Sequence, residues 1–131
     1  MRILLDTHVL VWVLLEPDRL SGDDRTAIEE AADEVLFSAV NIWEIAIKAQ
    51  LGRPGFVFDA GEIARTAIGS GFIELAVRSD AAARVGRLPL LHRDPFDRLL
   101  VAQALVEPAL LYTADRDLAP YSELVQVIRP L

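Results

Sequence analysis

Short apolar segments alternate with longer segments of helical pattern along the whole 131-residue chain. Each apolar segment carries hydrophobic residues at consecutive positions, so a strand formed there would be buried on both faces. Strands of this kind, separated by helices, indicate a parallel sheet covered by helices on both sides. The predicted strands are residues 2–5, 35–38, 72–77, 110–113 and 124–128. The predicted helices are residues 8–15, 39–51, 60–69, 79–88 and 94–106, with one more opening at Ser21. The order predicts an α/β fold, and the length predicts a single domain, residues 1–131.

Composition narrows the class of protein. The sequence is 53% hydrophobic with a mean hydropathy of +0.32, and part of this apolar excess can serve a partner surface. Cysteine is absent, which excludes disulfides and thiolate metal sites and fits a reducing compartment. The net charge of −7 argues against broad electrostatic attraction to nucleic acid or to an anionic membrane. It leaves room for a nucleic-acid enzyme whose acids are concentrated at a metal site.

No segment predicts membrane insertion. The uncharged run nearest the N-terminus, residues 7–15, is much shorter than the roughly 20 residues of a spanning helix. Residues 1–15 have only Arg2 as a basic region and lack the small-residue cleavage site of a signal peptide. We therefore expect a cytoplasmic protein with no membrane association.

Four acidic residues interrupt or end segments that otherwise read as buried core, namely Asp6, Glu44, Asp97 and Asp115. Burying a carboxylate without a partner is unfavourable, and several carboxylates at one point repel each other. A hard divalent cation such as Mg2+ or Mn2+ relieves both effects, because it prefers oxygen ligands. Asp6 and Asp115 directly follow predicted strands, where ligands bind in parallel sheets. A metal site at this edge is the leading hypothesis.

The first two acids also have structural explanations. Asp6 is a good N-cap for the helix that follows, although Thr7 is available for that role, so the two readings of Asp6 are evenly balanced. Glu44 stands four residues before Lys48, the chain's only lysine, and the two can form a surface ion pair.

The later acids occur in pairs. Asp94 precedes a proline and is fully explained as an N-cap, whereas Asp97, at the third helical position, is the better functional candidate. Asp115 and Asp117 follow a strand, where turns often contain aspartate, and Asp115 is preferred because it is nearer the strand end.

We expect structural roles for the two histidines and the two tryptophans of the chain. His8 and His92 lack metal-ligand spacing, so capping or surface roles are expected before catalysis. Trp12 and Trp43 fall on apolar helix stripes, which predicts core or subunit-interface positions.

Four sequence segments together resemble the PIN-domain ribonucleases, specifically the toxin half of VapBC-type toxin–antitoxin pairs. They are LLDTHVLVW (4–12), SAVNIWEIAIK (38–48), HRDPFDRLLVAQA (92–104) and TAD (113–115). Each segment alone is a weak to moderate signal, but the four in this order, at these separations, are specific. The resemblance covers essentially the whole chain.

The resemblance implies a three-layer α/β/α sandwich with a five-stranded parallel sheet, and cleavage of RNA phosphodiester bonds. It implies that Mg2+ or Mn2+ binds an acidic cluster formed by Asp6, Glu44, Asp97 and Asp115. Asp6 and Asp97 are assigned as direct ligands, with Glu44 and Asp115 orienting water or holding a second ion. It also implies a homodimer inhibited by a cognate antitoxin. The polar supports that it suggests are Thr7, Thr113 and, more weakly, Asn41.

Arginines beside these segments, Arg93, Arg98 and Arg116, are candidates for phosphate contacts, with solvated surface charge the more ordinary role for any one of them.

Two other folds with acidic metal sites fit this sequence poorly. A phosphate-receiver domain needs a lysine after a late strand, and a haloacid-dehalogenase-type phosphatase needs aspartate where this chain has His8. The remaining alternative is a catalytically silent binding module of the same fold. No motif identifies the RNA.

Overall fold

A five-stranded, all-parallel sheet forms the centre of the computed structural model, which describes residues 1–131. The strands lie in the order β3-β2-β1-β4-β5. Their bounds are β1 (Arg2–Leu5), β2 (Glu34–Ser38), β3 (Ile73–Leu75), β4 (Leu110–Thr113) and β5 (Val125–Val127). In the register, Leu4 of the central strand β1 pairs with Leu36 of β2 on one side and Leu111 of β4 on the other. The sheet and its parallel strands confirm the predicted fold class.

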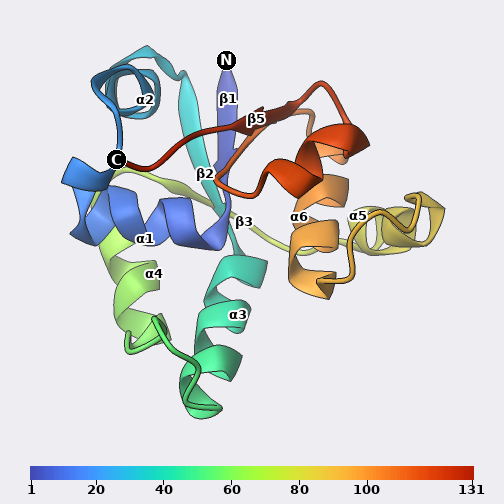
Figure 1. Ribbon diagram of the computed structural model, residues 1–131, viewed down its shortest axis with the longest axis horizontal. Coiled ribbons are helices and arrows are strands. Elements are labelled where there is room, and N and C mark those ends of the chain that lie inside the picture. The colour runs from blue at the N-terminus through green and yellow to red at the C-terminus, as the bar shows by residue number, and fades with distance from the viewer.

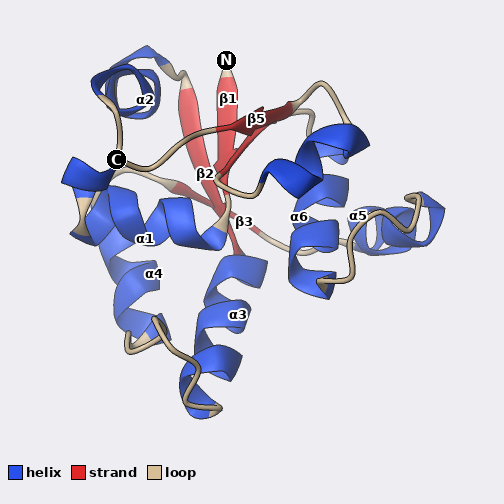
Figure 2. Ribbon diagram, in the orientation of Figure 1, coloured by secondary structure: helices blue, strands red, loops and turns tan.

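Helices cover both faces of this sheet (Figures 1 and 2). Their bounds are α1 (Thr7–Leu15), α2 (Gly22–Thr26), α3 (Ala39–Gln50), α4 (Ala60–Gly69), α5 (Ser79–Arg84) and α6 (Pro95–Val106). Shorter helical turns are the 3-10 segments Pro17–Arg19, Val85–Arg87 and Arg116–Tyr121 and the π segment Ala27–Ala31. No helix is both long and apolar enough to cross a bilayer.

Two hydrophobic cores lie on opposite faces of the sheet because successive strand residues point in opposite directions. Ile3 and Leu5 of β1 pack in one core with residues of α1 and α4. Leu4 packs in the other core with residues of α6, including Leu100. The result is the predicted three-layer α/β/α sandwich, with α1 and α4 on one side of the sheet and α5 and α6 on the other (Figure 1).

Several predicted boundaries are wrong in detail. The strand predicted at residues 72–77 is only Ile73–Leu75, an edge strand that pairs with β2 alone. The helix predicted to reach residue 88 ends at Arg84 and continues as a 3-10 turn. The 3-10 helix Arg116–Tyr121 was not predicted, because its sequence has proline near its end and no apolar periodicity.

The two tryptophans occupy different environments. Trp12 is partly buried and packs against the core beneath α1. Trp43 is 56% exposed on α3, so the core position offered as one of its alternatives is wrong. Its ring lies 5.1 Å from that of Phe96, at the start of α6. The subunit-interface alternative stays a prediction for both residues.

Candidate metal centre

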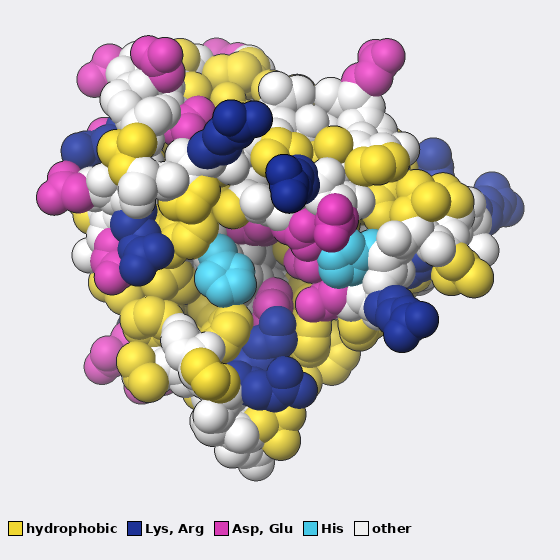
Figure 3. Space-filling view, in the orientation of Figure 1, with side chains coloured by type: hydrophobic (Ala, Val, Ile, Leu, Met, Phe, Trp, Pro, Cys, Tyr) yellow, Lys and Arg dark blue, Asp and Glu magenta, His cyan; other side chains and the backbone are white.

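The carboxyl ends of three neighbouring strands meet at one edge of the sheet, beside the start of α3 (Figure 2). A cavity of about 540 Å³ lies there. Its walls contain all four predicted acids, Asp6, Glu44, Asp97 and Asp115, together with Asp94. In Figure 3 acidic atoms show within a hollow that has the chain's two histidines at its rim. The fold thus collects carboxylates that lie far apart in the sequence.

Asp6 both ends β1 and caps α1. One of its carboxylate oxygens accepts a hydrogen bond from the backbone N–H of Val9, 2.9 Å away, and the other accepts from the hydroxyl of Thr113. Asp6 is therefore the N-cap of α1 and also lines the cavity, so the cap leaves its functional role open, and that role stays a prediction. Thr7 is not the cap, and that part of the prediction is wrong. Burial raises the pKa of Asp6, against the effect of its two hydrogen bonds.

Glu44 is buried at 3% exposure and is held by a chain of polar contacts. Its Oε1 accepts from the Thr7 hydroxyl at 2.5 Å, and its Oε2 accepts from the Nζ of Lys48 at 2.5 Å. Asn41 donates to the Thr7 hydroxyl at 3.1 Å and accepts from the backbone N–H of Ser38 at 2.7 Å. The ion pair with Lys48 exists as predicted, but in the wall of the cavity instead of on an open surface.

Asp94 and Asp97 stand at the start of α6 with different partners. Asp94 is the predicted N-cap, accepting from the backbone N–H groups of Phe96 and Asp97 at 2.8 and 3.2 Å. The Asp97 carboxylate accepts no hydrogen bond within the protein, and its nearest basic group is the His92 ring at 3.8 Å. Burial raises the pKa of Asp97 to about 7, assisted by the negative charges of Asp94, Asp6 and Glu44.

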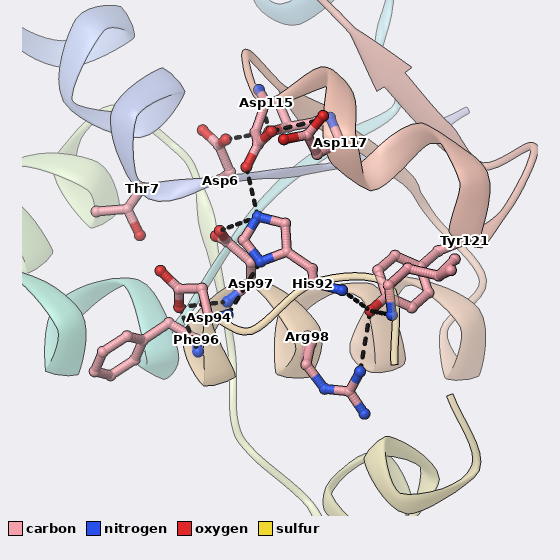
Figure 4. Close-up of polar contacts among 12 residues, drawn as sticks. Asp6, Thr7, His92, Asp94, Phe96, Asp97, Arg98, Asp115, Asp117 and Tyr121 are labelled. Atoms are coloured by element: carbon pink, nitrogen blue, oxygen red, sulfur yellow. Dashed lines mark hydrogen bonds and ion pairs between the residues drawn. The ribbon is translucent and has the colours of Figure 1, made fainter. Parts of the chain in front are cut away.

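His92 lies between two of the acids, and the expectation of a capping or surface role missed this position. Its Nε2 is 2.8 Å from Asp115 Oδ2, and its Nδ1 accepts from the backbone N–H of Asp94 at 3.0 Å. Donor atoms of His92, Asp97 and Asp115 all lie within 4.8 Å of one another. Figure 4 shows both carboxylates pointing toward the ring. The available sequence signal was its position two residues before the cap of α6.

The donor set fits a hard divalent cation. The Asp97 carboxylate accepts no hydrogen bond, and its raised pKa reports the unfavourable energy of ionising a buried carboxylate that also lies beside other acids. Carboxylate oxygens are the ligands that Mg2+ and Mn2+ prefer. Both oxygens of Glu44 already accept hydrogen bonds from Thr7 and Lys48, so Glu44 is held in a fixed orientation. Asp97 and Asp115 each have a carboxylate oxygen within 4.8 Å of the other's.

Residues near the cavity divide into those that face it and those that do not. Asp117 is exposed and donates its backbone N–H to Asp115 Oδ1 at 2.9 Å, which fixes Asp115 at the cavity (Figure 4). Arg98 is buried and donates to the carbonyl of Pro89 at 2.9 Å and to the Tyr121 hydroxyl at 3.0 Å. Its predicted role as a phosphate contact is therefore wrong. Arg93 and Arg116 are exposed, and their role stays a prediction.

Comparison with known proteins gives one family match and a curated relative. The model of the family described as PIN domain matches residues 3–124. The chain is 37% identical over 123 residues to Ribonuclease VapC22 of Mycobacterium tuberculosis, covering 88% of each protein.

Two solved structures share the fold. One is a crystal structure of VapBC2 from Rickettsia felis bound to a DNA fragment from their promoter, with a TM-score of 0.71, 12% identity and 99% of each chain covered. The other is a toxin–antitoxin complex from Klebsiella pneumoniae, with a TM-score of 0.61, 18% identity, and 95% of this chain and 99% of that chain covered. At these identities the likeness supports the fold alone.

Proposed function

This chain belongs to the PIN-domain family, and on that premise we propose that it is a metal-dependent endoribonuclease, the toxin component of a type II toxin–antitoxin pair. Its 37% identity to a protein named as a ribonuclease supports the activity. The single observation that carries the proposal is the acidic cavity, where Asp6, Glu44, Asp97 and Asp115 come together from four parts of the sequence.

The proposed cofactor is Mg2+ or Mn2+. When bound, such an ion lowers the pKa of a water molecule and offsets negative charge that develops on phosphate oxygens. Asp6 and Asp97 are proposed as direct ligands, and Glu44 and Asp115 as groups that orient water or hold a second ion. The hydrogen bonds of Glu44 to Thr7 and Lys48 suit an orienting role, because they fix its carboxylate. A carboxylate oxygen of Asp115 lies within 4.8 Å of one of Asp97, which supports the proposed role of Asp115 in orienting water or holding a second ion.

Two further side chains set the geometry and the charge of the cavity, which would receive an anionic substrate. His92 keeps its Nε2 against Asp115 because its Nδ1 is already occupied by the Asp94 N–H. Lys48 lines the cavity and contributes a positive charge among the acids. Because the remaining charge of the cavity is negative, RNA is expected to bind there only after a cation has neutralised the acids.

The proposed partners are an RNA substrate, a cognate antitoxin and a second copy of this chain. The two structural neighbours, VapBC2 and a toxin–antitoxin complex, support the antitoxin. The apolar composition of the chain is consistent with such partner surfaces. We place the protein in the cytoplasm, where RNA and antitoxin are both accessible.

The test is cleavage of a mixed cellular RNA pool by purified, antitoxin-free protein in Mn2+ and in EDTA. Cleavage is expected only with Mn2+, and Asp97→Asn is expected to slow it by at least roughly a hundredfold. The matched control is Asp23→Asn, an exposed aspartate in the first turn of α2, which should cleave like the wild type. Mapping the cut sites identifies the RNA.

Three outcomes contradict the proposal. Equal cleavage in EDTA, or by Asp97→Asn, would show that the acidic cavity is not the active site. Folded protein that binds Mn2+ but cleaves no RNA would instead support the catalytically silent binding module.

A further inference from the structure

A second cavity, of about 410 Å³, adjoins the acidic cavity between α1 and residues 55–58. The two cavities share three lining residues, Thr7, His8 and Trp12, so one continues into the other. In the proposed function the acidic cavity holds the metal ion and the scissile phosphate of RNA. The second cavity has no role in that proposal.

The second cavity is rich in aromatic rings. The His8 ring lies 6.0 Å from Trp12 at 41° and 5.6 Å from Phe56 at 65°, and Phe58 also lines the space. His8 is exposed, whereas Trp12 and Phe58 are partly buried. Figure 3 shows hydrophobic atoms around one of the two histidines at the rim of the hollow. An exposed ring backed by buried rings forms a surface on which a flat ligand can stack.

Positive charge accompanies these rings in a protein whose net charge is −7. The Arg19 guanidinium lies 5.7 Å from the centre of the Trp12 ring, and Lys48 Nζ lies 5.0 Å from that of Phe56. Each basic group also has an acidic partner, Arg19 in the half-exposed Glu16 at 3.2 Å and Lys48 in Glu44 at 2.5 Å. Aromatic faces combined with basic groups are the pattern by which proteins hold single-stranded nucleic acid.

We propose that this aromatic groove, lined by His8, Trp12, Phe56 and Phe58, is a nucleobase subsite. The base next to the scissile phosphate stacks there while its phosphate lies at the acidic cavity. The inference rests on the proposed ribonuclease function and adds to it the side chains that hold one unpaired base beside the scissile phosphate.

The test compares two oligomers of about eight residues, oligouridylate and an abasic chain with the same number of phosphates. Affinities are measured by fluorescence anisotropy with Ca2+ in place of Mn2+, to suppress cleavage. Wild-type protein is expected to prefer the base-bearing oligomer by about 5- to 150-fold, the range of one base stacked on an aromatic side chain. The affinity for the abasic oligomer reports phosphate contacts alone.

Two variants remove the proposed stacking surface, Trp12→Ala and His8→Ala. Both are expected to lose most of the preference for the base-bearing oligomer and to bind the abasic oligomer like the wild type. The matched control is Trp43→Ala, since Trp43 is an exposed tryptophan outside both cavities. If Trp12→Ala fails to fold, His8→Ala still decides the question, because the His8 side chain is exposed.

Several results would overturn the subsite. Equal wild-type affinity for the two oligomers would do so, as would a full preference in both groove variants or an equal loss in Trp43→Ala. If the groove variants elute as monomers in size-exclusion chromatography and the wild type elutes as a dimer, the groove is instead a contact between two copies of this chain. A base preference lost in the groove variants, in a protein that cleaves no RNA, would support the subsite and reject the nuclease.

Discussion

At the scale of single residues, the Asp97 carboxylate makes stability depend on pH. Its folded-state pKa of about 7 lies above the ordinary value of 3.8, so the folded protein binds this proton more tightly than the unfolded chain. The contribution of Asp97 to stability therefore decreases as pH rises from about 4 through 7. In metal-free protein, Asp97→Asn is expected to raise the melting temperature by several degrees at about pH 8, with a smaller effect toward pH 4.

Thermal unfolding in EDTA across this pH range is the measurement, with Asp23→Asn as a control for the loss of one surface charge. A variant less stable than the wild type at about pH 8 would show that the Asp97 carboxylate is not held in an unfavourable environment. Activity and stability are thus expected to change in opposite directions at this position, as is common where a site stores unfavourable charge.

Lys48 is the second residue whose contribution to stability can be measured by substitution. Glu44 is buried, and Lys48 is its only basic partner, at 2.5 Å. Lys48→Met leaves a buried carboxylate without its ion pair, so we expect the free energy of unfolding to fall by about 3 kcal/mol, the lower end for a buried pair because Lys48 is partly exposed. Lys48→Arg, which keeps the charge, should lose less.

Added Mn2+ is expected to raise the melting temperature of Lys48→Met more than that of the wild type, because the ion supplies the missing positive charge. Thermal melts with and without Mn2+ measure both effects. If metal-free Lys48→Met is as stable as the wild type, then the pair contributes nothing to the fold.

At the scale of elements, one tyrosine hydroxyl joins the 3-10 helix Arg116–Tyr121 to the segment before α6. The Tyr121 hydroxyl accepts from the backbone N–H groups of Leu91 and His92, at 3.2 and 2.9 Å, and from Arg98 Nη1 at 3.0 Å. Tyr121→Phe is expected to reduce stability by about 1–3 kcal/mol, because donors are left without a partner. His92 would then be held less firmly, and cleavage should be slower.

The matched control is Tyr112→Phe, at the chain's other tyrosine, which takes no part in these contacts. Amide hydrogen exchange provides the direct readout, with faster exchange expected at Leu91 and His92 in Tyr121→Phe. Unchanged exchange at both amides would show that backbone packing alone holds this segment.

Helices and strands were predicted accurately where local sequence signals determine them, and less accurately where long-range contacts do. The strands β1 and β4 and the helix α6 were predicted almost to the residue, because apolar runs and an Asp-Pro cap are local signals. β3 was predicted too long, since the extent of an edge strand depends on how much of it finds a partner. The Tyr121 contacts are long-range and leave no mark in local sequence.

At the scale of the whole molecule, the strand order explains the acidic cavity. β1 lies between β2 and β4, so their carboxyl ends bring Asp6, the start of α3 and Asp115 to one edge. Local patterns singled out all four acids but placed only Asp6 and Asp115 at strand ends, and the family resemblance implied that Glu44 and Asp97 join them. His92 was missed because its role depends on the path of the segment before α6, and Arg98 was misread because its burial is a tertiary property.

The whole molecule is acidic, and this bears on when RNA can bind. With a net charge of −7 and at least five carboxylates at one cavity, metal-free protein repels phosphates there. The proposed divalent ion would convert that repulsion into attraction locally, without changing the rest of the surface. We therefore expect one set of carboxylates both to bind the ion and to support cleavage.

The most direct test of that claim compares Mn2+ binding, by calorimetry on RNA-free protein, with the Mn2+ dependence of RNA cleavage. We predict that half-saturation of binding and half-maximal cleavage fall at the same Mn2+ concentration under matched conditions, and that Asp97→Asn weakens both. Cleavage that persists in EDTA, or Mn2+ binding unchanged in Asp97→Asn, would contradict the account.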